Sequence, residues 1–254
     1  MLHEIIREHP LVSGFSQTGA PEDEGQHLQT IYNPAKAHGG PGKYIFDKRS
    51  YINEHHQLAT EKSAKAILEQ WKPYYDTSCS YLIEKSPPNL IRTRFLQKLF
   101  CNCKFVVILR HPLAVAYATQ KWSKTSIKSL VEHTLRGYEI LLEDLPFLNS
   151  AYVLRYEDFV VNPQEEIDNI YKFIGLESCQ VEHEVLIDVN DKYFSMWGND
   201  SNNLIKKLSF RVTAKLETRA NKFGYSISEY SSLIPTSILG IHDKKIQPVS
   251  TSGS

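Results

Sequence analysis

Apolar residues in this chain follow two alternating patterns. Short, largely apolar runs predict four strands, at residues 11–15, 81–84, 104–109 and 151–159. Apolar residues at helical spacing predict helices around them, at residues 2–8, 22–32, 57–71, 86–100, 111–122, 129–145 and 163–176. Such alternation is typical of an α/β fold, in which helices cover both faces of a parallel sheet. The run at 81–84 has the composition of a buried strand, and the run at 104–109 that of a continuous apolar strand.

The spacing of these elements predicts a single domain over residues 1–245. Residues 35–44 contain three glycines and one proline, which predicts a loop. The polar residues 246–254 predict a disordered C-terminal tail.

The charge balance argues against partners that are recognised through bulk charge. The 254 residues include 29 Lys and Arg and 29 Asp and Glu, so neither a nucleic acid nor a membrane is an expected partner. No apolar stretch approaches the roughly 20 residues of a membrane helix, and the first ten residues do not resemble a signal peptide. We therefore expect a cytoplasmic protein. The four cysteines lack a second metal-type pair, so no metal site is expected.

Polar side chains follow the apolar residues YLI, FVVIL and YVL of three predicted strands, at the edge of an α/β sheet where ligands bind. They are Glu84-Lys85-Ser86, Arg110-His111-Pro112 and Arg155-Tyr156-Glu157-Asp158. Arg110 comes directly before a predicted helix, and a guanidinium beside a helix N-terminus is suited to binding phosphate. The alternative is that Arg110 forms a salt bridge with Glu157 or Asp158.

Taken together and in order, these segments resemble the sulfotransferase family that uses 3′-phosphoadenosine 5′-phosphosulfate (PAPS). The matching stretches are EKSPPNLIRTRFLQKLF, KFVVILRHP and LRYEDFVVNPQEEIDNIYKFIGL, and the resemblance runs from the first residues to about Leu176, more loosely to Tyr225. It implies a fold like that of P-loop nucleotide hydrolases. It also implies transfer of a sulfonate group from PAPS, without a metal, to a hydroxyl or amine of a small molecule, glycan or peptide.

The resemblance implies that Arg110 binds the 3′-phosphate of PAPS. The family usually places a serine eight residues later, where this chain has Ala118. Thr119 is the neighbouring candidate for this contact, although adjacent helical residues point about 100° apart. Tyr156 corresponds to a tyrosine near the adenine, and the alternative is a buried strand aromatic. Residues 35–56 and 190–206 are expected to line the acceptor pocket.

The resemblance also suggests where the catalytic groups lie. Some relatives place a glutamate base in the stretch that matches residues 9–28, which makes Glu22 and Glu24 the candidates, with His27 next. The alternative is an acidic first turn that complements a helix dipole. Lys85 matches a lysine that stabilises charge between the sulfonate and its leaving group; the alternative is a surface lysine.

Family members begin with a strand and a phosphate loop, commonly P-[KR]-[ST]-G-[ST]-[ST], which holds the 5′-phosphosulfate. The first residues here, MLHEIIREHP, resemble the helix that follows this loop. We therefore expect a sheet without its first, central strand, and an N-terminally truncated enzyme that binds PAPS weakly or not at all. Two alternatives stay open: a non-catalytic sulfotransferase-like binding domain, and a P-loop kinase acting on a small molecule.

Overall fold

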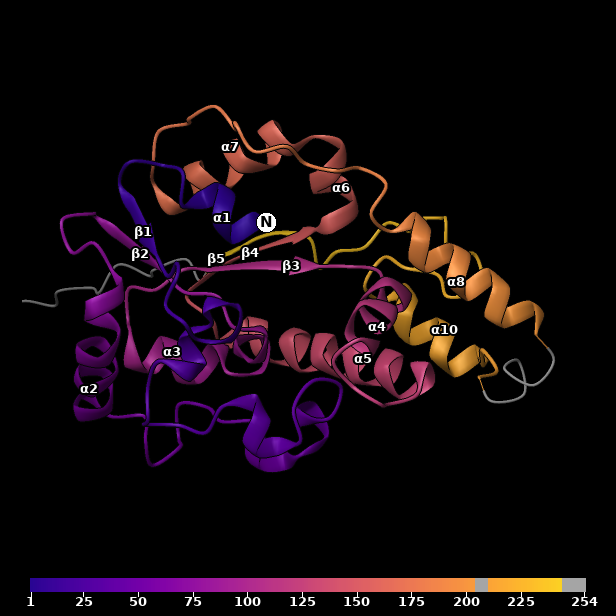
Figure 1. Cartoon of the computed structure of the whole chain (residues 1–254), viewed down its shortest axis with the longest axis horizontal. Helices are drawn as coiled ribbons and strands as arrows, with labels where there is room; N and C mark the ends of the chain where they lie inside the picture. The colour runs from indigo at the N-terminus through magenta and orange to yellow at the C-terminus, as the bar shows by residue number, and fades with distance from the viewer. Residues whose placement is uncertain (204–209, 244–254) are drawn as a thin grey trace, which may run out of the picture.

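The structure, a computed structural model, describes residues 1–203 and 210–243. Its α-helices, labelled as in Figure 1, are α1 (Leu2–Ile6), α2 (Glu61–Trp71), α3 (Thr93–Leu99), α4 (Pro112–Gln120), α5 (Ile127–Asp144), α6 (Tyr156–Val161), α7 (Pro163–Ile174), α8 (Asp191–Asn202) and α10 (Ala214–Asn221). Its strands are β1 (Val12–Gly14), β2 (Tyr81–Ile83), β3 (Phe105–Leu109), β4 (Ser150–Arg155) and β5 (Gly240–Asp243). The four strands expected from the sequence are all present.

The strands of the described residues form two separate sheets. In the first, β1 and β2 are parallel, with Val12 opposite Tyr81. In the second, β3 and β4 are parallel, with Phe105 opposite Ala151, and β5 pairs antiparallel with β4. The separation agrees with the expectation of a sheet without its central strand. The sequence does not predict β5, because its residues GIHD contain a single large apolar side chain.

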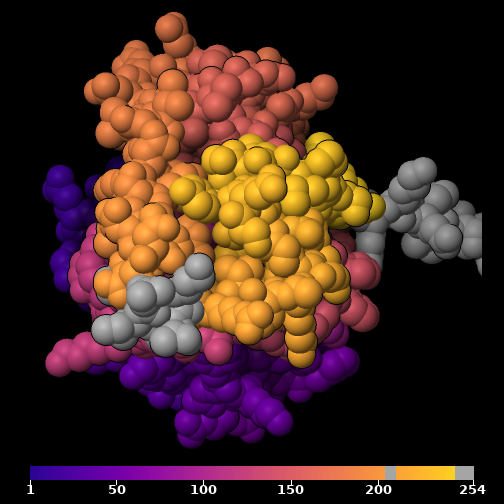
Figure 2. Space-filling view, turned by 90° about the vertical axis from the view of Figure 1, so that its right-hand side faces the viewer, coloured from indigo at the N-terminus to yellow at the C-terminus, as the bar shows by residue number. Residues whose placement is uncertain are grey.

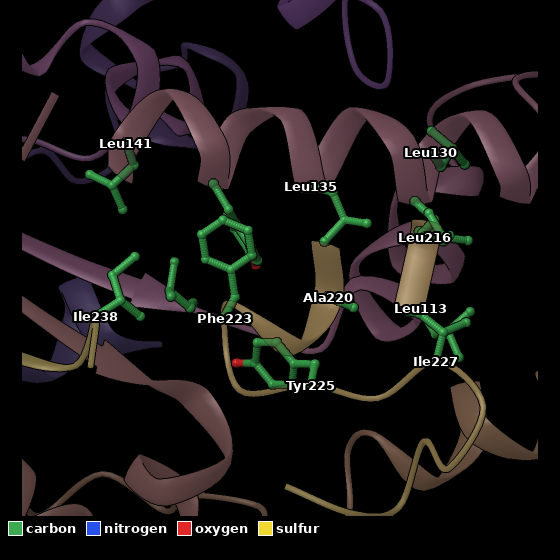
Figure 3. Packing of buried hydrophobic residues seen from close by; sticks show 14 of the residues in the cluster. Leu113, Leu130, Leu135, Leu141, Leu216, Ala220, Phe223, Tyr225, Ile227 and Ile238 are labelled. Atoms are coloured by element: carbon green, nitrogen blue, oxygen red, sulfur yellow. The ribbon is translucent and has the colours of Figure 1, made fainter. Parts of the chain in front are cut away.

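Helices cover both faces of the β3–β4 sheet (Figure 1). Side chains alternate along a strand, so Val106 and Ile108 point to one face and Val107 and Leu109 to the other. The first pair packs in a cluster with α1, α6 and α7, and the second pair packs with α4, α5 and α10. Figure 3 shows part of the second cluster, where side chains of α5 face those of α10 and the segment after it. Burial on both faces explains why all residues of β3, 105–109, are apolar.

The β1–β2 sheet shares an apolar cluster with the larger sheet. Val12, Tyr81 and Ile83 belong to the cluster that covers one face of β3 and β4. Leu82 points the other way and is 46% exposed. The prediction that residues 81–84 form a buried strand is therefore wrong at Leu82, because the second face of this small sheet is not covered there.

Residues 22–32 do not form the expected helix. They form two 3₁₀ turns, at Pro21–Asp23 and Gly25–His27. Glu22 has a φ of 52°, in the left-handed region that a right-handed helix does not contain. The side chain of Gln29 accepts hydrogen bonds from two main-chain N–H groups, and such local bonds compete with helix formation.

Three other predicted elements have different bounds in the structure. The helix expected at 57–71 begins about one turn later, as α2. The helix expected at 86–100 is broken at Arg92, where a 3₁₀ turn ends and α3 begins. The strand expected at 151–159 ends at Arg155, and α6 follows it directly.

The chain after residue 190 forms one face of the molecule. Figure 2 shows α8, α10 and the segment that leads to β5 side by side on this face. Trp197 of α8 and Leu216 of α10 are buried in the cluster with α4 and α5. In Figure 1, α8 lies beyond the carboxyl end of β3. The tail predicted at 246–254 lies outside the described residues.

Candidate functional site

The candidate residues gather into two clusters near the carboxyl ends of the strands. The acid–lysine cluster follows β2 and consists of Glu24, His27, Glu84 and Lys85. The arginine cluster follows β3 and β4 and consists of Arg110, Tyr156, Asn190 and Tyr193. Such strand ends are the usual ligand-binding edge of an α/β sheet.

Glu24 is the buried carboxylate of the acid–lysine cluster. Its side chain oxygen Oε1 lies 3.7 Å from Lys85 Nζ, and its Oε2 lies 3.8 Å from His27 Nε2. The Gln26 side chain donates a hydrogen bond to Oε2. The carboxylate therefore has a cation and a possible proton carrier within reach.

The other two acids of this turn are placed differently. Glu22 is exposed, and it meets Lys85 through its carbonyl oxygen, which accepts from Nζ at 3.1 Å. The Asp23 carboxylate accepts from the Thr18 hydroxyl and main chain, and these bonds lower the pKa of Asp23. The structure thus brings the carboxylate of Glu24, and not that of Glu22, to Lys85.

Glu84 anchors the turn that carries Glu24, a contact that the sequence does not reveal. Its Oε1 accepts from the N–H of Gly25 at 2.9 Å, and the Ser86 hydroxyl accepts from the N–H of Gln26 at 3.1 Å. Burial raises the pKa of the Glu84 carboxyl. The main chain after Glu24 is therefore docked on the end of β2.

A methyl group at position 25 has no space beside Glu84 and Phe15. A Cβ there would lie 2.5 Å from Glu84 Cγ and 2.6 Å from Phe15 Cε2. We expect Gly25→Ala to lower the free energy of unfolding by about 1–3 kcal/mol, as other overpacked sites do. Urea unfolding measures this change. Gly198→Ala is the matched control, because its Cβ would meet the Tyr230 hydroxyl at 3.6 Å; equal stability of the two variants would contradict the tight docking.

The Arg110 guanidinium lies between two aromatic rings. Its Cζ is 4.2 Å from the centre of the Tyr156 ring and 5.5 Å from that of Tyr193, within cation–π range. Its Nε donates to Asn190 Oδ1 at 2.9 Å. Its Nη2 is buried and has no hydrogen-bond partner among the described residues. A buried guanidinium nitrogen without a partner is costly unless a ligand supplies one.

The alternative salt bridge of Arg110 with Glu157 or Asp158 does not form. Asp158 pairs with Arg155, with 2.8 Å between Oδ2 and Nε. Glu157 accepts from the N–H of His111 at 2.9 Å. The hypothesis that Arg110 joins the two strand ends through an ion pair is therefore wrong.

The main chain at Arg110 is held by Tyr138 of α5. The Tyr138 hydroxyl accepts from the Arg110 N–H at 2.9 Å and donates to the Arg110 carbonyl at 2.7 Å. His111 caps α4, since its Nδ1 accepts from the N–H of Leu113 at 3.2 Å. Burial lowers the pKa of His111 to about 4, so the neutral ring presents Nε2–H to the Ser226 carbonyl at 3.0 Å.

Thr119 and Tyr156 have different relations to Arg110. Tyr156 is the first residue of α6, buried, and in contact with the guanidinium. Thr119 lies near the end of α4, whereas Arg110 precedes that helix, and the helix rise over this stretch is roughly 10 Å. In the part of the chain that the structure describes, no contact joins Thr119 to Arg110, so its role stays a prediction.

Two buried tyrosines lie between the clusters. Burial raises the pKa of Tyr44, and the nearby Glu24 carboxylate adds to this shift. Burial also raises the pKa of Tyr138, which is within electrostatic range of both Arg110 and Tyr44. Tyr44 comes from the loop that the sequence analysis expects to line an acceptor pocket.

Among residues 1–203 and 210–243, no group of three His, Cys, Asp or Glu side chains is placed to hold a metal ion. None of the helices in these ranges is long and apolar enough to span a bilayer.

Comparison with known proteins identifies the family. A family model described as the sulfotransferase family matches residues 1–180. A search of curated proteins found no significant match. Among solved structures, the sulfotransferase domain from the curacin biosynthetic pathway is similar, with 16% sequence identity, a TM-score of 0.44 and coverage of 69% of each chain. Because the family model spans well over half of its residues, this chain belongs to the sulfotransferase family.

Proposed function

We propose that this protein transfers a sulfonate group from PAPS to a hydroxyl or amine acceptor. The observation that carries the proposal is the unpartnered, buried Nη2 of Arg110 at a strand end of a sulfotransferase-family chain. A buried guanidinium nitrogen without a partner is unfavourable, an anion would supply the missing acceptor, and arginine binds phosphate bidentately.

In this proposal the arginine cluster binds the 3′-phosphate of the donor. The Tyr156 ring, buried and 4.2 Å from the guanidinium carbon, lies beside the nucleoside. The neighbouring helix α4 begins directly after Arg110 and His111, so the positive end of its dipole adds to the attraction for the anion.

The acid–lysine cluster acts on the acceptor. Glu24 takes the proton of the acceptor hydroxyl or amine, and that oxygen or nitrogen forms a bond to sulfur. The bond between sulfur and the bridging phosphate oxygen breaks, and 3′-phosphoadenosine 5′-phosphate (PAP) leaves with the electron pair. Lys85 Nζ lies 3.7 Å from the Glu24 carboxylate. Its positive charge stabilises the negative charge that develops on the bridging phosphate oxygen. His27 is the second candidate for the base.

Small molecules, glycans and peptides are all within the proposed acceptor class. Tyr44, from the loop at residues 35–56, is buried within electrostatic range of Glu24. We place the acceptor against this loop, because irregular connections beside strand ends commonly determine specificity.

A shift of the melting temperature with PAP tests whether the chain binds the proposed donor nucleotide. We expect millimolar PAP to raise the melting temperature of the chain, because a ligand that binds the native state stabilises it. AMP and ATP, which lack the 3′-phosphate, should give a clearly smaller rise. Transfer from 35S-labelled PAPS to a panel of phenols, glycans and tyrosine peptides tests the reaction.

Each outcome has a distinct meaning. A PAP-specific shift with no labelled product favours a non-catalytic binding domain. Phosphorylation of an acceptor by ATP favours a kinase. A folded chain with no preference for PAP over AMP contradicts the proposal.

A further inference from the structure

The Arg110 side chain is oriented by Asn190, a residue outside the part of the chain that the family model matches. Asn190 is 6% exposed and immediately precedes α8. Its Oδ1 accepts from Arg110 Nε at 2.9 Å, and its Nδ2 donates to Glu157 Oε1 at 2.7 Å. One amide thus connects the guanidinium to a carboxylate on the neighbouring strand end.

Glu157 determines which way the Asn190 amide points. Its Oε1 also accepts from the His111 N–H at 2.9 Å, and its Oε2 accepts from the Tyr225 hydroxyl at 3.0 Å. An ionised carboxylate can only accept, so the Asn190 NH₂ must face Glu157 and its oxygen must face Arg110. The guanidinium Nε–H can only donate, so Arg110 requires the same orientation, and the two neighbours of Asn190 together fix its amide.

This orientation limits how an anion can approach the guanidinium. An arginine binds a phosphate bidentately either side-on, through Nε and one Nη, or end-on, through both Nη atoms. Asn190 occupies Nε, and Nη2 has no partner among the described residues. The Tyr156 and Tyr193 rings lie 4.2 and 5.5 Å from Cζ, so the plane of the guanidinium is restrained as well.

We propose that Asn190, itself held by Glu157, is a positioning residue that directs both Nη atoms of Arg110 to a phosphate for end-on binding. The proposal rests on the proposed function, because the phosphate is the 3′-phosphate of the donor.

The packing of α8 supports this role. Phe194 of α8 contacts the His111 ring edge-on, at 5.0 Å between ring centres, and α8 packs beside α4 beyond the carboxyl end of β3 (Figure 1). Asn190 is therefore attached to a helix that packs on His111, the residue directly after Arg110. A rigid attachment allows one hydrogen bond to orient a guanidinium.

Binding of PAP and AMP to single variants tests the proposal, because these ligands differ only in the 3′-phosphate. We expect Asn190→Ala to weaken PAP binding about 5- to 20-fold, less than loss of the arginine itself, because it removes a bond that orients the guanidinium and no contact with the phosphate. AMP binding should be unchanged. Asn190→Asp, of the same shape, keeps an acceptor for Nε but adds a negative charge beside the phosphate. We expect this variant to weaken PAP binding more than Asn190→Ala does. Titration calorimetry gives both affinities.

Asn199→Ala is the matched control, because Asn199 is an exposed asparagine on the same helix. It should keep the wild-type ratio of PAP to AMP affinity. A wild-type ratio in either Asn190 variant overturns the proposal, and a parallel loss of PAP and AMP binding overturns it too, since that result indicates a general structural role. A wild-type chain that does not distinguish PAP from AMP contradicts the proposed function itself.

Discussion

Replacing Arg110 with alanine should abolish the preference of this chain for PAP over AMP. The guanidinium is the charged group at the end of β3 whose buried Nη2 has no partner among the described residues. A hydrogen bond to a charged group contributes about 1.5–3 kcal/mol, so PAP affinity should fall by about 10- to 150-fold. Arg110→Lys should also lose most of the preference, because an ammonium group cannot bind phosphate bidentately.

The Arg110 variant should still fold. The main-chain bonds of residue 110 with Tyr138 do not involve the guanidinium. Arg136→Ala is the control, since Arg136 is partly exposed and pairs with Glu143 on the surface. Titration calorimetry with PAP and AMP measures the effect, and a variant that still prefers PAP would remove Arg110 from the phosphate site.

Glu24→Gln should lower kcat for sulfonate transfer by about 100-fold or more, the usual contribution of a general base. The amide has the shape of the carboxylate but cannot take the acceptor proton. PAP affinity should be unchanged, because Glu24 has no contact with the arginine cluster in the described structure.

Glu22→Gln is the matched control for this experiment. Glu22 is two residues away and exposed, and it meets Lys85 through its main-chain carbonyl, which the substitution keeps. Its turnover should stay near that of the wild type. If Glu24→Gln turns over normally, the base is another group, and the corresponding His27 variant is the next to measure.

The positions of the candidate residues were predicted most successfully where each residue directly follows a strand. Arg110 directly follows an apolar strand, and Tyr156 directly follows the next one. Parallel pairing of these two strands, with Leu109 opposite Arg155, brings the two side chains together. The apolar runs predicted where the two strands end, whereas the place of Tyr156 beside the nucleotide was only implied by the family resemblance.

The sequence was least informative around residues 22–32. Acidic residues followed by apolar ones suggested a helix, but side-chain bonds from Asp23 and Gln29 to the main chain replace it. The choice between Glu22 and Glu24 depends on this difference. A helix would place both near its first turn, whereas the observed turn exposes Glu22 and buries Glu24 beside Lys85.

The order of strands and motifs, the α/β class and the position of Arg110 were determined by the sequence alone, since these depend on local periodicity and on neighbours in the chain. Tertiary structure alone decided that Glu84 binds the main chain of the Glu24 turn and that Asn190 accepts a hydrogen bond from Arg110. These pairs are 59 and 80 residues apart in the chain. No local pattern encodes such contacts, because they arise only when packed layers bring distant strand ends and helices together.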